Sequence, residues 1–338
     1  MHSSDVISGE TGHSGSWCDP GRLSWVRVSG AEAVRFLDSF TTAAVSRVAD
    51  GHGCEGFFTD VRGQVICLAG LLRCGPEAGE EPAVEIVADG DVGGPLAEHL
   101  ERYHIREPIE IEDVSASRQT VALLGDGVAN GLASLAAGSR KPSDLTRNLA
   151  HTLVTLASTG GTDAVARLVR CDWGGPHGWL LVCGAAEADA AREALTAAGF
   201  THQDGTAWEQ ARIEAGTPRQ CDLLPKTLPQ ELGRDARAIS FTKGCYLGQE
   251  TVARLDALGH VNRRLVTLAV AGDAVPPAGA AISSGSETIG AVSSSCFSPT
   301  LGKPLALAIL PVKPLTAGAH LTIDGQPAQL VDHAPSEG

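Results

Sequence analysis

The chain has 338 residues, which is long for one hydrophobic core and predicts two or three packed units. Hydrophobic residues make up 43% of it but aromatic residues only 4%, so the interior must be built mainly from Ala, Val and Leu. The formal net charge of −14 argues against an extended phosphate-binding surface and therefore against nucleic acid as a direct ligand.

Composition also indicates the compartment. Residues 1–20 have neither a basic start nor an apolar centre, so they predict a flexible N-terminal tail rather than a signal peptide. The longest apolar runs, residues 65–72 and 305–310, are too short to cross a bilayer. Nine cysteines without a Cys-x-x-Cys pair do not form the pattern of a disulfide framework. We expect a soluble cytoplasmic protein with no membrane partner.

Strand and helix patterns follow one another through the first part of the chain. Residues 23–28 alternate as a strand does, and residues 31–40 then place Ala33, Phe36 and Phe40 on one helical face. Residues 54–73 predict a hairpin with its turn at 60–63. Further strands are expected at 84–87, 109–112, 120–124, 164–170 and 179–182, and helices at 92–103, 128–137, 187–199 and 208–215.

Loops and turns carry three further predictions. The Gly125-Asp126-Gly127 turn lacks the third glycine of a dinucleotide fingerprint, because Asn130 holds its place, so we expect an ordinary strand-to-helix turn. Residues 218–240 read as a long functional loop. After residue 260 only short strands are expected, at 262–270, 288–294, 305–310, 321–324 and 325–331, with no helix among them, which predicts a small antiparallel barrel or sandwich.

The most informative segment is Lys-Gly-Cys-Tyr-Leu-Gly-Gln-Glu at residues 243–250. A helix is predicted after Gly248, and Gly259 stands at its C-cap position. Cys245 therefore precedes a helix N-terminus, whose partial positive charge, together with Lys243, would favour a thiolate. This makes Cys245 a candidate metal ligand, redox centre or nucleophile. The alternative is a small, buried structural cysteine.

With these residues in view, the chain resembles the YgfZ family of folate-binding proteins, which are relatives of the glycine-cleavage T-protein, an aminomethyltransferase. The segment 243–250 is similar to that family's signature. Residues 212–216 resemble its Arg-x-Glu-x-Gly element, residues 228–231 its approach to the cysteine, and residues 262–265 the entry to its barrel. The resemblance covers residues 20–332.

The resemblance implies an α+β fold, a three-lobed T-protein-like ring around a hole that accepts tetrahydrofolate. Residues 21–262 would form two interleaved α+β lobes, and residues 263–338 a C-terminal antiparallel β-barrel. Glu214 would hydrogen-bond the pterin edge. Lys243, Arg254 or Arg263 would meet the glutamate tail of folate, unless salt bridges to Glu250 or Asp256 account for these charges. The remaining candidate folate-binding residues are Arg212, Tyr246, Gln249 and Glu250.

Two departures from the T-protein pattern matter for activity. Cys67 and Leu68 stand where the T-protein has its acidic pair, so no carboxylate is available there for proton transfer. A second T-protein element is represented by residues 173–178, which keep the glycines without the acids. Aminomethyl transfer by the T-protein route is therefore not expected.

The resemblance thus favours an accessory protein that binds a reduced folate and supports iron–sulfur cluster assembly or repair, with Cys245 as the working thiol and iron–sulfur client or assembly proteins as partners. One thiolate cannot hold a cluster alone. Cys245 would either supply one ligand to a shared, transient cluster or act by thiol exchange. The rival hypothesis is a folate-dependent one-carbon transferase.

Overall fold

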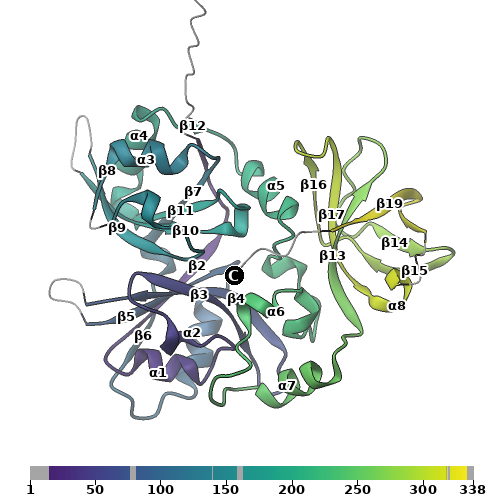
Figure 1. The fold of residues 1–338 in the computed structure, drawn as a ribbon, viewed down its shortest axis with the longest axis horizontal. Helices are drawn as coiled ribbons and strands as arrows, with labels where there is room; N and C mark the ends of the chain where they lie inside the picture. The colour runs from purple at the N-terminus through teal and green to yellow at the C-terminus, as the bar shows by residue number, and fades with distance from the viewer. Residues whose placement is uncertain are drawn as a thin grey trace, which may run out of the picture.

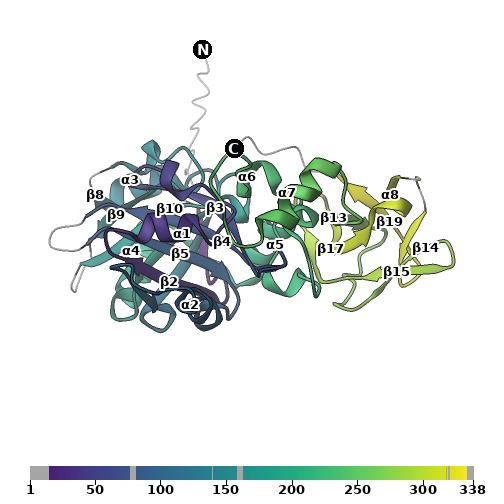
Figure 2. The ribbon, with the colours of Figure 1, turned by 90° about the horizontal axis from the view of Figure 1, so that it is seen from below.

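The computed structural model describes residues 15–76, 81–138, 140–157, 163–316, 318 and 320–332. It contains three β-sheets, which we call the N-terminal, middle and C-terminal sheets. The N-terminal and middle sheets pack face to face, with helices on their outer faces, and the C-terminal sheet lies to one side (Figures 1 and 2). No helix among the described residues is long and apolar enough to cross a membrane.

The N-terminal sheet is antiparallel and is covered on its outer face by two helices, α1 (Ala33–Asp38) and α2 (Gly93–Glu101). Its strands, in spatial order, are β3 (His52–Thr59), β4 (Val65–Cys74), β5 (Ala83–Asp89), β2 (Leu23–Ser29) and β6 (Glu110–Asp113). The side chains of β2 alternate between the two faces. Val26 and Val28 therefore belong to the core beneath the helices, and Trp25 belongs to the core between the sheets.

The middle sheet has helices α3 (Val128–Leu135) and α4 (Ala188–Ala197) on its outer face. Its strand order is β12 (Thr201–His202), β1 (Ser16–Cys18), β7 (Arg118–Leu124), β11 (Trp179–Gly184), β10 (Ala164–Arg170), β9 (His151–Leu156) and β8 (Ala136–Gly138). The tail predicted over residues 1–20 is wrong where β1 pairs with β7 and β12. Three residues are too few to show periodicity. Residues 1–14 lie outside the described part.

The chain returns from the middle sheet to the N-terminal sheet, which interleaves the two lobes. It does so through helices α5 (Thr206–Glu214), α6 (Asp235–Ala238) and α7 (Gln249–Leu258). Leu232, Tyr246 and Val252 of this return segment pack on Phe57 and Leu68 of the β3–β4 hairpin. The predicted long loop at 218–240 contains α6 and two 3-10 turns.

The C-terminal sheet is a curled, antiparallel half-barrel. Its strand order is β15 (Glu287–Ala291), β14 (Ala281–Ser284), β18 (Leu321–Ile323), β19 (Gln326–Val331), β13 (Arg263–Val270), β17 (Lys303–Pro311) and β16 (Ser294–Ser298). The expectation of no helix here is wrong, because α8 (Val312–Thr316) follows β17. That helix is too short to show a helical period, and it contains Pro314. The α+β class with a C-terminal antiparallel unit is confirmed.

Candidate functional site: the cysteine loop and its supports

The loop that carries Cys245 is fixed to the N-terminal lobe through Lys243. The Lys243 ammonium donates to the carbonyls of Thr41, at 2.8 Å, and Ala43, and lies 3.6 Å from an Asp38 carboxylate oxygen. An ammonium has three N–H donors, so all three are engaged by the protein. Burial lowers the Lys243 pKa despite the neighbouring Asp38. Lys243 therefore holds the loop in place and has no donor left for the Cys245 sulfur or a ligand.

The start of α7 is fitted tightly against the β3–β4 turn. The Leu247 N–H donates to the Ser39 carbonyl at 2.9 Å, and the Leu247 carbonyl accepts from the Thr59 hydroxyl at 2.7 Å. Gly248 has φ +83°, and a Cβ atom there would lie 2.7 Å from the Asp60 carbonyl oxygen. Only glycine fits this position without displacing the hairpin.

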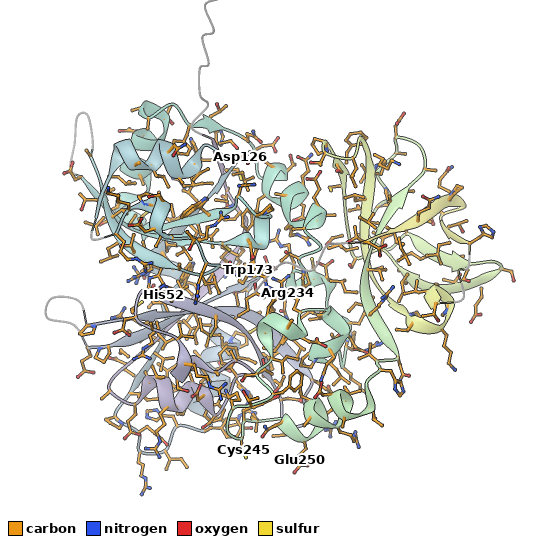
Figure 3. All side chains as sticks on the ribbon, viewed as in Figure 1. His52, Asp126, Trp173, Arg234, Cys245 and Glu250 are labelled. Atoms are coloured by element: carbon orange, nitrogen blue, oxygen red, sulfur yellow. The ribbon has the colours of Figure 1, made fainter. Side chains whose placement is uncertain are left out.

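Cys245 itself is exposed, which excludes the alternative of a buried structural cysteine. All nine cysteines are free thiols, and only Cys221 and Cys245 are exposed. The next residue, Tyr246, is buried in the cluster beneath the loop, and burial raises its pKa to about 12. The buried Tyr246 thus anchors the loop while the neighbouring thiol stays exposed. Figure 3 places Cys245 and Glu250 at the same margin of the molecule.

The other candidate residues near the loop differ in whether their side chains form ion pairs. Gln249 is half-buried, and Arg254 and Glu250 are exposed, without an ion pair among the described residues. Arg263 forms a two-pronged ion pair with Glu231, with both N–O distances 2.9 Å. Salt bridges from Lys243 or Arg263 to Glu250 or Asp256, which the sequence left open, are therefore not formed.

Arg212 and Glu214 lie in a second group, where α5 meets the C-terminal sheet. The Arg212 guanidinium donates five hydrogen bonds, which engage all its N–H groups, to Glu209, Asp222, the Thr217 carbonyl and the Ser294 hydroxyl. Arg212 is thus a positioning residue with no donor left for a folate. The Glu214 carboxylate accepts from the Ser298 hydroxyl, from the Thr300 N–H at 3.2 Å and from the Thr300 hydroxyl at 2.9 Å.

A buried ion cluster that the sequence did not reveal joins the lobes. Glu55 of β3 accepts from Arg234 at 2.8 and 2.6 Å and from the Trp173 indole at 3.1 Å. Arg237 bridges Glu55 and Asp172. Burial alone would raise the Glu55 pKa, but Arg234 outweighs it and the pKa is lowered. Figure 3 shows Trp173 and Arg234 near the centre of the molecule. In the sequence, the one sign of this cluster is that a glutamate, Glu55, stands within the otherwise apolar strand predicted at residues 54–59.

The positions that depart from the T-protein pattern carry no acid. Cys67 is buried, and burial raises its pKa to about 12, so it stays a neutral thiol. Leu68 lines a small pocket together with Asp89 and Arg219. Asp89 accepts from Arg219 at 2.7 Å and from the Gln220 N–H at 2.9 Å. Burial raises the pKa of Asp89 although Arg219 opposes it.

Cys245 lines neither of two pockets of the molecule. One, of about 540 Å³, lies between the N-terminal and middle sheets, and the other is the small pocket beside Leu68. Within the described part of the chain no group of three or more His, Cys, Asp or Glu side chains could hold a metal ion. Cys245 could therefore supply only one ligand to a metal centre.

Asp235, which follows Arg234 of the ion cluster in the sequence, is expected to make the stability of the fold depend on pH. Burial and then Asp256 raise its pKa from 3.8 to about 6. A carboxyl whose pKa is raised by folding contributes stability below pH 3.8 that is lost as the pH rises to about 6. We expect Asp235→Asn to be more stable than the wild type at pH 7 by about 2 kcal/mol. Urea unfolding should show this gain growing between pH 4 and pH 6. A gain that is equal at both pH values would contradict the assignment.

Comparison with known proteins shows which class of fold the chain has. The fold is that of a glycine-cleavage aminomethyltransferase T from Bartonella henselae, with TM-score 0.75 over 96% of this chain and 86% of that one, at 19% identity. Residues 263–333 match the glycine cleavage T-protein C-terminal barrel domain. An aminomethyltransferase of Cutibacterium acnes is 28% identical over 90% of this chain and 82% of its own length.

A tRNA-modifying protein YgfZ of Colwellia psychrerythraea is 27% identical over 72% of this chain and 68% of its own length. The chain is thus similar in sequence to YgfZ and to aminomethyltransferases, and it has the aminomethyltransferase fold. It spans about half the length of two other curated relatives, from Arabidopsis thaliana (55%) and Streptomyces avermitilis (46%).

Proposed function

We propose that this protein binds a reduced folate and supports the assembly or repair of iron–sulfur clusters in client proteins, with Cys245 as the working thiol. The observation that carries the proposal is the exposure of Cys245 on a loop held from both sides, by Lys243 and by Gly248. Such a loop presents a thiol to a partner without a large entropic cost of ordering. The folate part rests on the likeness to aminomethyltransferases and YgfZ.

Arg212 and Glu214, where α5 meets the C-terminal sheet, have few hydrogen-bonding positions left for a folate. A carboxylate offers about four lone-pair positions. Glu214 uses three of them on the Ser298–Thr300 turn. One acceptor position therefore remains for a pterin N–H, and a second becomes available if the exposed Thr300 hydroxyl turns away. The Glu214 carboxylate would orient the pterin, and Arg212 would hold α5 in place beneath it.

A cluster would have to be shared. The donor set of the described chain offers one exposed thiol at this loop and no further cysteine beside it in the motif, whereas a cluster needs about four ligands. Cys245 would donate one thiolate, and the client protein would supply the others. Thiol exchange is the alternative action: the Cys245 thiolate would attack a disulfide of the client, forming a mixed disulfide and releasing one client cysteine as a thiolate, and non-reducing electrophoresis detects the mixed disulfide.

The thiol is tested by complementation of cells that lack this protein, with the activity of an iron–sulfur enzyme as the readout. Cys245→Ala is expected to restore no more activity than an empty vector. Cys221→Ala is the matched control, because Cys221 is the other exposed cysteine, and it is expected to restore wild-type activity. Full activity with Cys245→Ala would contradict the proposal and leave the protein a scaffold.

A second candidate function is a folate-dependent one-carbon transferase. The favouring observation is that Asp89 lies beside Leu68, next to the position where the T-protein has its acids. Its ion pair with Arg219 counts against a role as a base. We expect no methylenetetrahydrofolate to form from tetrahydrofolate and an aminomethyl donor. Turnover that Asp89→Asn abolishes would instead establish the transferase.

A further inference from the structure

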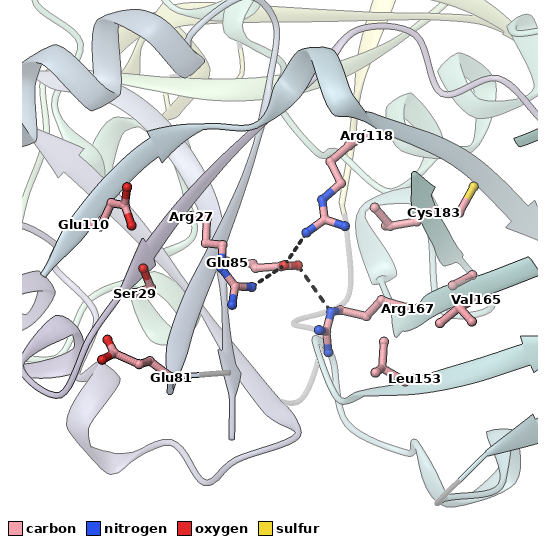
Figure 4. Close-up of a pocket in the computed structure, with 12 residues that line it drawn as sticks. Arg27, Ser29, Glu81, Glu85, Glu110, Arg118, Leu153, Val165, Arg167 and Cys183 are labelled. Atoms are coloured by element: carbon pink, nitrogen blue, oxygen red, sulfur yellow. Dashed lines mark hydrogen bonds and ion pairs between the residues drawn. The ribbon is translucent and has the colours of Figure 1, made fainter. Parts of the chain in front are cut away.

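A cleft lies between the N-terminal and middle sheets, and its lining residues are far in sequence from the cysteine loop (Figure 4). Its volume of about 540 Å³ falls within the usual range for small-molecule sites. Strands β2 and β5 form one side, and strands β7, β9, β10 and β11 form the other. Neither Glu214 nor any residue of the motif lines it.

Three arginines of this cleft converge on one carboxylate. Glu85 lies 3.3 Å from Arg27, 2.8 Å from Arg118 and 3.3 Å from Arg167. Glu85 is 2% exposed and Arg167 is 8% exposed, so this is a built, desolvated cluster rather than a set of surface charges. Arg167 also contacts the ring nitrogen Nδ1 of His151 at 3.1 Å, so the cluster extends beyond the carboxylate.

One donor of the cluster is left unsatisfied by the side chains around it. The Nε–H of Arg118 is buried and has no hydrogen-bond partner, although its Nη2 atom donates to Glu85. A buried donor without a partner costs free energy, and its usual explanation is a water, an ion or a ligand. Arg118 lines the cleft, so such a partner would enter from there.

The middle-sheet wall of the cleft is apolar around Arg167, whose neighbours in register on the adjacent strands are Leu153 and Val182. Leu153, Val165 and Val182 line it, and Val165 is 54% exposed. Two exposed carboxylates, Glu81 and Glu110, also line the cleft. Figure 4 draws them on the N-terminal-sheet side, away from the apolar side chains. The cleft thus combines a guanidinium cluster with an apolar surface for the body of a ligand.

We propose that this cleft binds a small organic anion, whose phosphate or carboxylate oxygens meet Arg118 and its neighbours while its apolar portion packs on Val165. A guanidinium matches two oxygens of either group in a bidentate geometry. Glu81 and Glu110 disfavour the approach of any anion by charge repulsion and so lower its affinity. This inference does not depend on the folate proposal.

The test is calorimetric titration of the full chain at low ionic strength with three probes: adenosine monophosphate, succinate and inorganic phosphate. We expect saturable binding of the monophosphate or of succinate, and the better of the two identifies the anionic group. Arg118→Gln should weaken that binding about tenfold or more, the usual effect of losing a charge-assisted hydrogen bond. Glu110→Gln should strengthen it, and Arg22→Gln, which changes an exposed arginine outside the cleft, should not change it.

Several results would overturn the inference. They are the absence of saturable binding for every probe up to millimolar concentration, binding of inorganic phosphate alone, or equal losses in Arg118→Gln and Arg22→Gln. If Arg118→Gln fails to fold, Arg118→Lys takes its place. It keeps the positive charge but loses the two-pronged geometry of the guanidinium, so its affinity for the probe is expected to lie between that of the wild type and that of a variant without the charge. Tetrahydrofolate binding by the Arg118 variants should equal that of the wild type, so the two proposals can fail separately.

Discussion

Replacing Glu55 by alanine is expected to lower the free energy of unfolding by about 3–5 kcal/mol, because the substitution leaves buried Arg234 without its counter-ion. Arg234 is 7% exposed and donates two hydrogen bonds to Glu55, and the Trp173 indole donates a third. No other acceptor for the Arg234 guanidinium is found in the part of the chain that the structure describes. Urea unfolding followed by circular dichroism measures the loss.

An exposed ion pair supplies the control for this prediction. Asp91 pairs with Arg22 at 2.7 Å, and both side chains are largely exposed. Asp91→Ala should therefore change the free energy of unfolding by no more than about 0.5 kcal/mol. If Glu55→Ala costs no more than Asp91→Ala, the Glu55 cluster does not hold the two lobes together.

Replacing Gly248 by alanine is expected to cost about 2–4 kcal/mol and to displace the loop that carries Cys245. Part of the cost is the left-handed backbone at φ +83°. The larger part is steric, because the new methyl group would lie 2.7 Å from the Asp60 carbonyl oxygen and from the Thr59 hydroxyl. The loss is measured by urea unfolding, and the displacement by the rate at which a maleimide reagent labels Cys245.

Gly259, at the other end of α7, is the matched control. It also has a left-handed backbone, with φ +68°, but an added Cβ atom would meet no atom within 4 Å. Gly259→Ala should therefore cost only the backbone strain, about 1–2 kcal/mol, and leave Cys245 labelling unchanged. If the two variants lose the same free energy of unfolding, the close approach of Gly248 to the hairpin does not contribute to the cost of the substitution.

Local patterns in the sequence were sufficient for the elements that bury one regular face. The alternation at residues 23–28 predicted β2, and Gly248 and Gly259 at the two ends of the predicted helix marked the bounds of α7. Each of these signals lies within one segment, so no knowledge of distant partners was needed. Short elements gave no such signal, which is why β1 and α8 were missed.

The candidate site was only partly predictable, because its geometry depends on residues far apart in the chain. Exposure of Cys245 agrees with a reactive thiol. The partners of Lys243, however, come from about 200 residues earlier, so the sequence could not show that its donors are engaged. Arg212 and Arg263 are similar in part: each has an acidic partner in a separate 3-10 turn, although Glu209, a further partner of Arg212, is on the same helix as Arg212.

The most direct test of the central claim is calorimetric titration of the full chain with tetrahydrofolate. We expect one saturable site, at least tenfold weaker binding in Glu214→Gln because a charged acceptor is lost, and unchanged binding in the exposed control Glu287→Gln. No binding by the wild type, or equal binding by wild type and Glu214→Gln, would contradict that claim.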